Sequence, residues 1–231
     1  MLAGQRAIFP DTAETELKET FFGEQPGYFV DVGANDPKNI SQTWHLERRG
    51  WTGVLIEPQP PLAHKLKEQR RAKVFACVCS SPANAGKILR LHVAGMRRED
   101  VTEVPARTLD DILEEAGAPT PIDFLSIDVE NHEIEVLSGL TLQRWRPRLI
   151  LIEDMAHNLR IHRALTARGY KWVRRTGLNS WYAPADSPMT VGPFGQWQFV
   201  RKHYIGVPFR HLREAKRKQR EKLRAALGRG G

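Results

Sequence analysis

Two clusters of small and acidic residues, about a hundred residues apart, each follow directly on a short apolar segment. The first stretch reads Tyr28-Phe-Val-Asp-Val-Gly-Ala-Asn-Asp36, and the second reads Phe124-Leu-Ser-Ile-Asp-Val-Glu-Asn-His-Glu133. Short apolar runs of this kind are typical of strands buried on both faces of a parallel sheet, which binds ligands at the carboxyl ends of its strands. We therefore expect both clusters to lie at one edge of a sheet and to do chemistry there.

The first cluster has the composition of a turn that approaches a nucleotide-like ligand. Gly33 can adopt backbone conformations that residues with a Cβ avoid, and Asn35 tolerates the left-handed region. Glu57 ends the next apolar segment, about 25 residues further on, where an acidic side chain can accept hydrogen bonds from ribose hydroxyls. The Gly-x-Gly-x-x-Gly pattern that positions a pyrophosphate is absent, so these residues favour S-adenosylmethionine over NAD.

The second cluster, together with a third, suits methyl transfer to an alcohol. The methyl group of a sulfonium is already activated, but an alcohol must lose its proton to a base or bind a metal that lowers its pKa. Asp128 ends one predicted strand and Glu153-Asp154 end the next. These three carboxylates would suit Mg²⁺. In the alternative, Asp128 and Glu130 cap the following helix and contact the cofactor's amine.

Two histidines follow the same predicted strands and are candidate general bases. His132 comes after Asp128, and His157 comes after the Glu153-Asp154 pair. An imidazole changes its charge near neutral pH, so either ring could accept the proton of an alcohol. We prefer His157 because it follows its acidic pair directly; ordinary surface positions are the alternative for both.

The elements that position these clusters alternate along the chain. Strands are expected over 28–32, 53–57, 73–78, 122–127 and 148–152, with an additional strand over 87–94 and a closing hairpin of 170–175 and 180–183. Helices are expected over 11–22, 41–49, 60–71 and 157–168. One further helix is expected to begin at Thr108, and a short one is expected to end at Leu137. Residues 95–105 show no clear period and are expected to form a loop. Alternating strands and helices predict a mostly parallel sheet with right-handed crossovers.

Composition narrows the class of protein. A chain of 231 residues is long enough for one α/β domain with a sizeable core. Its composition, 41% hydrophobic and 27% charged, is ordinary for a soluble protein. No apolar run is long enough for a transmembrane helix, and the first ten residues lack the apolar stretch of a signal peptide. Cys77 and Cys79 lie two residues apart, which is not a metal or redox spacing. We expect buried thiols in a cytoplasmic protein.

The net charge of +8 is concentrated at the C-terminus. Residues 210–231 contain nine Lys or Arg and two Glu, so residues 1–209 are close to neutral. The high pI therefore describes a tail rather than the domain. The tail has apolar residues on a broken stripe, and we expect it to bind an anionic membrane surface or a glycolipid assembly, to bind nucleic acid, or to be solvated.

Three motifs resemble a known family. Phe-Val-Asp-Val-Gly-Ala-Asn-Asp, Leu-Ile-Glu-Pro and Phe-Leu-Ser-Ile-Asp-Val-Glu-x-x-Glu-x-x-x-Leu-x-Gly are similar, in order and spacing, to the FkbM-like methyltransferases, over roughly residues 12–183. The resemblance implies an α/β, Rossmann-like class I methyltransferase fold: a seven-stranded, mostly parallel sheet with helices on both faces. It also implies S-adenosylmethionine as cofactor and O-methylation of hydroxyls on sugars and natural products.

The resemblance also implies roles for individual residues. Asp31, Gly33, Ala34 and Asn35 would hold the methionine part of the cofactor, Glu57 its ribose, and Cys79 and Ser80 would lie near the adenine. We further expect Ser41, Pro58, Asp128 and Glu130 to line the cofactor site. Asn131 replaces the glycine that is usual in the third motif, and the turn is expected to survive because asparagine tolerates left-handed backbone.

We therefore expect four segments: an N-terminal helical segment (1–23), the methyltransferase domain (24–186), a Pro/Gly/aromatic extension (187–209) and the basic tail (210–231). The predicted activity is O-methylation of a hydroxyl on a carbohydrate or glycosylated metabolite, in the cytoplasm and peripheral to a membrane, by an enzyme that could form homo-oligomers. One alternative is an RNA methyltransferase, although the Asn/Asp-Pro-Pro-Tyr motif of amino methylation is absent and nucleic acid is the less favoured partner. Another is a non-catalytic protein that binds S-adenosylmethionine.

Overall fold

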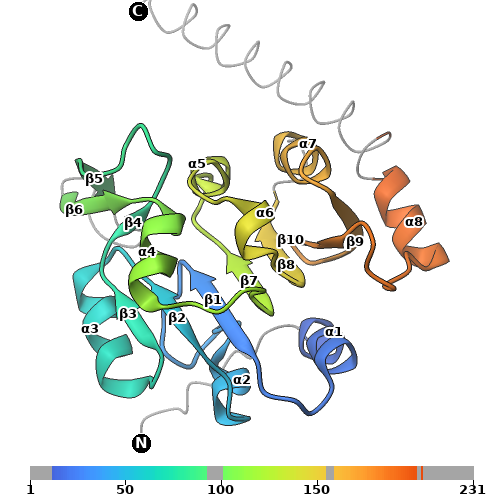
Figure 1. The fold of residues 1–231 in the computed structure, drawn as a ribbon, viewed down its shortest axis with the longest axis horizontal. Coiled ribbons are helices and arrows are strands. Elements are labelled where there is room, and N and C mark those ends of the chain that lie inside the picture. Colours follow the sequence, from blue (N-terminus) through green and yellow to red (C-terminus); the bar gives the residue numbers. More distant parts are fainter. Residues whose placement is uncertain (1–11, 93–100, 155–158, 202–203, 205–231) are drawn as a thin grey trace, which may run out of the picture.

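A single seven-stranded sheet forms the centre of the molecule (Figure 1). The computed structural model describes residues 12–92, 101–154, 159–201 and 204. The strand order is β3-β2-β1-β7-β8-β10-β9, and all strands run parallel except β10, which is antiparallel to both neighbours. The strands are β1 (Tyr28–Val32), β2 (Thr52–Ile56), β3 (Lys73–Phe75), β7 (Phe124–Ile127), β8 (Leu149–Glu153), β9 (Tyr170–Thr176) and β10 (Asn179–Pro184).

Helices cover both faces of this sheet, as predicted. The strands alternate: Val30 and Ile150 point into one apolar core, while Phe29 and Leu149 point into the other. On the first face lie α4 (Leu109–Ala116), α5 (Glu133–Ser138), α6 (Leu142–Trp145) and α7 (Arg160–Thr166), and on the second lie α1 (Thr12–Phe22), α2 (Trp44–Arg48) and α3 (Pro60–Gln69). Burial on both faces explains why the central strands read as apolar runs.

A smaller sheet corrects two sequence-based predictions. The strand predicted over 73–78 is divided: β3 ends at Phe75 and stays in the main sheet, while β4 (Val78–Cys79) pairs with β6 (Val101–Arg107). β6 falls largely within the stretch predicted as a loop, and it also pairs with β5 (Ile88–His92), which confirms the additional strand. The strand β6 was missed because its buried positions, Val104 and Ala106, are separated by a proline and flanked by exposed residues.

The two ends of the described chain pack against the sheet. Helix α1 contributes Leu17 to the second core, and the ring of Phe22 contacts Trp51 with centroids 4.9 Å apart. A further helix, α8 (Pro193–Val200), lies within the Pro/Gly/aromatic extension (187–209) and packs against β9. Pro193 is tolerated there because it occupies the first turn of the helix. Among the described helices, none has the length and apolar character needed to cross a bilayer.

Candidate active site

The turn after β1 lies where three strands end together. Gly33 has φ +87°, and a Cβ at this position would lie 1.8 Å from the carbonyl oxygen of Asp128. The N–H groups of Gly33 and Ala34 both donate to the carbonyl of Ile56, at 2.9 and 3.1 Å. Only glycine fits this junction between β1, β2 and β7, which places a backbone with little side-chain bulk at the edge of the sheet.

Glu57 fixes the same turn from the end of β2. One carboxylate oxygen accepts from the N–H of Asn35 and the other from the N–H of Gln59, each at 2.9 Å. Asn35 has the left-handed backbone expected for it, with φ 53°. Glu57 is almost fully buried, and burial raises the pKa of its carboxyl group although the two N–H groups oppose that shift. Each oxygen keeps a second lone pair, so Glu57 fits the predicted contact with ribose while it also holds the loop in shape.

Glu57→Gln is expected to weaken the binding of S-adenosylhomocysteine by roughly tenfold or more and to lower the free energy of unfolding by about 1–3 kcal/mol. An amide has one acceptor oxygen, so one of the two backbone N–H groups loses its partner. Calorimetry and denaturant titration measure the two effects. Glu68→Gln on the exposed surface of α3 is the matched control and should change neither. Equal affinity in both variants would contradict this role.

Two residues predicted to contact the cofactor, Asp31 and Ser41, are buried and hydrogen-bonded to other protein groups. Asp31 is buried, and its Oδ2 accepts from Thr43 Oγ1 at 2.7 Å. Ser41 is also buried, and its Oγ accepts from the N–H of Trp44. Both belong to a network around the buried guanidinium of Arg70, which donates to Ser41 Oγ, Thr43 Oγ1, the carbonyl of Pro37 and the carboxylate of Glu47.

This network supports the loop from below, and it was not predicted from the sequence. The Nε of Arg70 lies 2.7 Å from Glu47 Oε2, and both side chains are almost completely buried. Burial of such a pair requires that most of its hydrogen-bonding capacity be satisfied, as it is here. An arginine at the end of a surface helix carries no sequence signal of burial, so no pattern in the sequence could have identified it.

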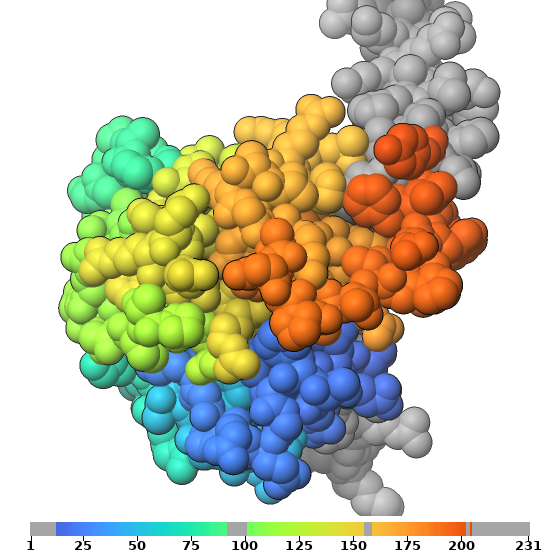
Figure 2. Space-filling view, turned by 45° about the vertical axis from the view of Figure 1, so that its right-hand side comes forward, coloured from blue at the N-terminus to red at the C-terminus, as the bar shows by residue number. Residues whose placement is uncertain are grey.

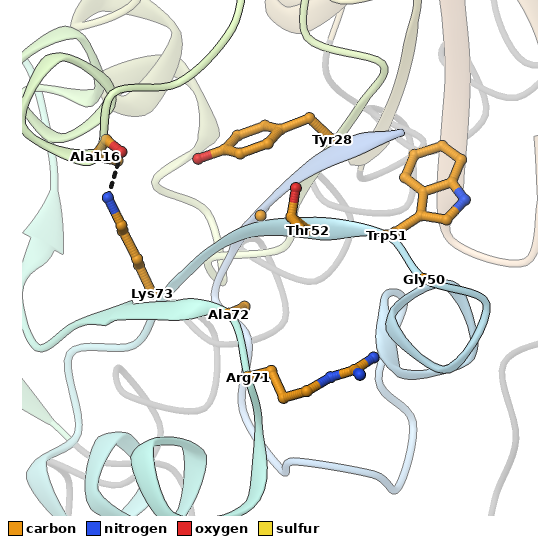
Figure 3. A pocket seen from close by; sticks show the side chains of 9 residues that line it. Tyr28, Gly50, Trp51, Thr52, Arg71, Ala72, Lys73 and Ala116 are labelled. Carbon is orange, nitrogen blue, oxygen red and sulfur yellow. Dashed lines mark hydrogen bonds between the residues drawn. The ribbon is translucent and has the colours of Figure 1, made fainter. Parts of the chain in front are cut away.

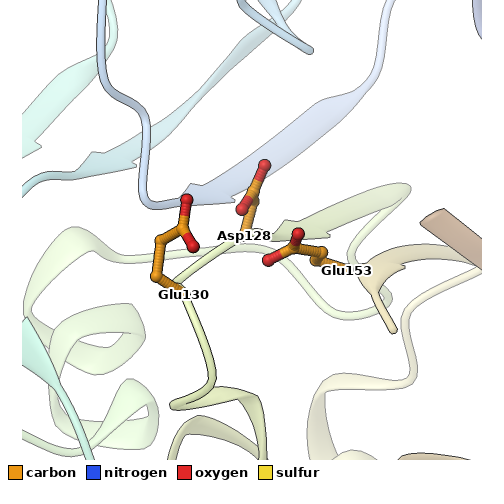
Figure 4. A group of neighbouring side chains, drawn as sticks. All are labelled: Asp128, Glu130 and Glu153. Carbon is orange, nitrogen blue, oxygen red and sulfur yellow. The ribbon is translucent and has the colours of Figure 1, made fainter. Parts of the chain in front are cut away.

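Three carboxylates meet at the ends of β7 and β8 (Figure 4). One oxygen from each of Asp128, Glu130 and Glu153 lies within 4.8 Å of the others. Burial and then the Glu130 carboxylate raise the pKa of Asp128 to about 6, and burial and then Asp128 raise the pKa of Glu153 to about 7. Asp128 and Glu153 are hydrogen-bonded to each other. The close approach of these carboxylates therefore favours protonation of the group relative to isolated acids.

Asp154 lies apart from this group, and Glu130 takes the place predicted for it. Successive residues of a strand point to opposite faces, so Asp154 turns away from Glu153. Its Oδ2 accepts from Ser180 Oγ at 3.1 Å in a fully buried position. Glu130 reaches the group because its backbone is left-handed, with φ 52°, and the left-handed conformation predicted for Asn131 is also present, with φ 77°. His157 lies outside the described residues.

His132 is already hydrogen-bonded within the protein. Its Nε2 lies 3.1 Å from Ser80 Oγ, which also accepts from Asn84 Nδ2 at 3.0 Å. This contact connects the residue before α5 to the loop that follows β4, and it occupies a nitrogen that a general base would use. Cys79 points into the first apolar core, where burial raises the pKa of its thiol well above the usual value. Of the two residues predicted to lie near the adenine, Cys79 and Ser80, it is Ser80 that contacts His132.

A separate cavity of about 420 Å³ opens at the opposite edge of the sheet, where β1, β2 and β3 begin (Figure 3). Tyr28, Thr52 and Lys73 line it, and Lys73 Nζ donates to the carbonyl of Ala116 at 2.6 Å. Parallel strands place their starts and their ends at different edges. This cavity is therefore distant from Gly33 and the carboxylate group, and it takes no part in the site described here.

Comparison with known proteins identifies the family. The sequence profile described as "Methyltransferase FkbM domain" matches residues 31–172, which is more than half of the chain and includes the turn at Gly33 and the three carboxylates. No protein in a curated set matches the chain. The turn with its glycine at position 33 and the acid at the end of β2 fit S-adenosylmethionine, which supplies an activated methyl group when bound.

Solved structures resemble the chain at low sequence identity. The methyltransferase FkbM from Methylobacillus flagellatus KT is 16% identical over 68% of this chain and 43% of that chain, with a TM-score of 0.48. A methyltransferase from Geobacter sulfurreducens is 14% identical over 77% of this chain and 80% of that chain, with a TM-score of 0.45. This chain thus spans less than half of the Methylobacillus chain.

The sheet has the strand number and strand directions expected for the predicted class I fold. It has seven strands, all parallel except one near the edge, and helices cover both faces. The match of the family profile covers that sheet from the end of β1 into β9. The chain therefore belongs to the FkbM methyltransferase domain family.

Proposed function

We propose that the enzyme methylates a hydroxyl group of a carbohydrate or of a glycosylated metabolite. The observation that carries this proposal is the group of Asp128, Glu130 and Glu153 at the edge of the sheet, beside the turn at Gly33. Carboxylates accept hydrogen bonds from hydroxyls, and three of them within reach of one another suit an acceptor with several neighbouring hydroxyls. The methyl donor would lie beside the same edge.

Proton removal is assigned to the Asp128–Glu153 pair. A general base works best when its pKa is close to the working pH, and these two groups have pKa values raised to about 6 and about 7. One carboxylate of the pair would orient the acceptor hydroxyl while the other takes its proton as the oxygen attacks the methyl carbon. His132 is then a positioning residue, because its Nε2 is engaged by Ser80.

A divalent cation is the second route to the same proton. Asp128, Glu130 and Glu153 would supply oxygen ligands of the type that Mg²⁺ prefers. A cation held there would lower the pKa of the acceptor hydroxyl, so no base of high pKa would be needed. The two routes differ in their response to a chelator.

An amino acceptor in RNA is less well supported. The residues after β7 read Asp-Val-Glu-Asn, which lacks the Asn/Asp-Pro-Pro-Tyr motif of amino methylation, and residues 1–209 carry a net charge close to zero. A role in cofactor binding without catalysis would not use the carboxylates of Asp128, Glu130 and Glu153 as a base or as metal ligands.

The enzyme supplied with radiolabelled S-adenosylmethionine is expected to label sugar-containing acceptors from a panel of nucleotide sugars, glycosides, glycolipids and RNA. The label should resist mild base, as an ether does and an ester does not. Activity that disappears in EDTA and returns with Mg²⁺ assigns the cation route, and activity that is indifferent to EDTA assigns the carboxylate pair. Label found in RNA and in none of the sugar-containing acceptors would overturn the proposal.

A further inference from the structure

Helix α8 presents large apolar side chains to solvent along one side. Phe194 is 63% exposed, Trp197 53% and Val200 46%, and Tyr204 beyond the helix is 70% exposed. Positions three and four apart lie on the same face of a helix, so the first three form a continuous stripe. The rings of Phe194 and Trp197 are stacked with centroids 6.3 Å apart. We call Phe194, Trp197, Val200 and Tyr204 the outer stripe.

The opposite side of α8 holds the helix firmly on the sheet. The side chain of Gln198 accepts from the N–H of Arg175 and donates to its carbonyl, and the ring of Phe199 lies 5.4 Å from that of Trp172. Gly195 is buried, and a Cβ there would lie 3.0 Å from the carbonyl of Val173. The outer stripe is thus a fixed feature of the flank of the molecule, where α8 forms the outermost layer (Figure 2).

Positive charge accompanies the outer stripe. The guanidinium of Arg201 lies over the ring of Trp197, 5.3 Å from its centroid. In the sequence, Lys202 follows, and residues 210–231 contain nine Lys or Arg against two Glu. Trp, Tyr and Phe on one face, combined with Lys and Arg, are typical of segments that lie at a membrane interface. Basic residues near an anionic surface are attracted to it electrostatically.

We propose that the outer stripe, with Arg201 beside it, docks on an anionic lipid surface. The stripe would enter the interface, and the positive charge would hold it there reversibly. Arg175, whose backbone is hydrogen-bonded to Gln198 of α8, also donates from Nη1 to the carbonyl of Asp154 at 2.8 Å, next to Glu153. Helix α8 is thereby connected through Arg175 to the end of β8 that carries Glu153.

Two other partners fit the outer stripe less well. A second copy of the chain would bring a second segment with a charge of +7, so that like charges would repel. Single-stranded RNA also binds aromatic side chains next to cations. However, Val200 offers no π-face, and the near-neutral charge of residues 1–209 provides no basic path for a longer strand.

The test is co-sedimentation of the full chain with vesicles of phosphatidylcholine alone or of phosphatidylcholine and phosphatidylglycerol in equal parts. The wild type should sediment with the anionic vesicles and should be released by high salt. Phe194→Ser/Trp197→Ser should reduce the partition coefficient by roughly tenfold or more, since two aromatic groups no longer enter the interface. Ile88→Thr, which changes an apolar side chain of similar exposure on the small sheet, is the matched control and should bind as the wild type does.

Unfolding temperature and affinity for S-adenosylhomocysteine should be unchanged in the double variant, because both side chains are exposed. Equal sedimentation of the wild type and the double variant overturns the proposal. Absence of anionic-vesicle binding also overturns it. In that case, an oligomer that dissociates in the double variant assigns the stripe to a second copy, and single-stranded RNA binding that the double variant loses assigns it to RNA.

Discussion

Gly33→Ala is expected to abolish cofactor binding and to destabilise the protein more than any other single glycine change in the described structure. The new Cβ would lie 1.8 Å from the carbonyl oxygen of Asp128, which is far inside van der Waals contact. Asp128 cannot move away freely, because its own N–H donates to the carbonyl of Val32 at 2.9 Å. The ends of β1 and β7 must separate, and the turn that presents the backbone to the cofactor is lost.

The backbone conformation alone accounts for only part of this effect. Alanine at a left-handed position costs roughly 1–2 kcal/mol, and the steric overlap adds the cost of displacing the strand. Gly169→Ala separates the two contributions, since Gly169 has φ +85° and a Cβ there would meet nothing within 4 Å. Chemical denaturation and calorimetry with S-adenosylhomocysteine should show a modest loss of stability and intact binding for Gly169→Ala. Similar behaviour of the two variants would show that the contact with Asp128 is unimportant.

Asp128→Asn is expected to lower the rate of methyl transfer by about 10²–10⁴-fold, the usual effect of removing a general acid–base group. The wild-type rate should rise with pH through about 6 to 7, where the Asp128–Glu153 pair becomes ionised. In the variant the charge that repels Glu153 is absent, so the pKa of Glu153 should fall and the remaining pH dependence should move to lower pH. Initial rates across this pH range measure both effects.

Stability should respond in the opposite direction to activity. Both acids have pKa values in the folded protein above those in the unfolded chain, so their ionisation opposes folding. That penalty is absent below the unfolded pKa values, near pH 4, and it grows as the pH rises to about 7. Asp128→Asn should therefore raise the unfolding temperature at pH 8 and leave it unchanged near pH 4.

Asp186→Asn at an exposed position after β10 is the control for both measurements. It should alter neither the rate nor the dependence of stability on pH. If Asp128→Asn retained the wild-type rate, the proton of the acceptor would have to leave by a route that does not involve the carboxylate pair.

The sequence by itself determined the central strands and the turn at the first of them. β1, β7 and β8 are buried on both faces, so the sequence of each is an apolar run. Small or acidic residues follow each run. Gly33 and Asn35 were identified because positive φ restricts the choice of residue, and Glu57 because an acid follows the apolar run of β2. The closing hairpin predicted over 170–175 and 180–183 corresponds to β9 and β10. In each case the constraint is local, and it is therefore written in consecutive residues.

Only the tertiary structure decided which side chains meet. Glu130 rather than Asp154 joins Asp128 and Glu153, because a left-handed backbone turns Glu130 toward the group while the strand period turns Asp154 into the interior. The role of Asp31 beneath the loop depends on Arg70, which is 39 residues away in the sequence. Such contacts join residues that are distant along the chain. The residue type of a charged side chain does not show whether that side chain is buried or solvated. The physical reason is that burial and pairing are properties of the packed sheet, which no local pattern records.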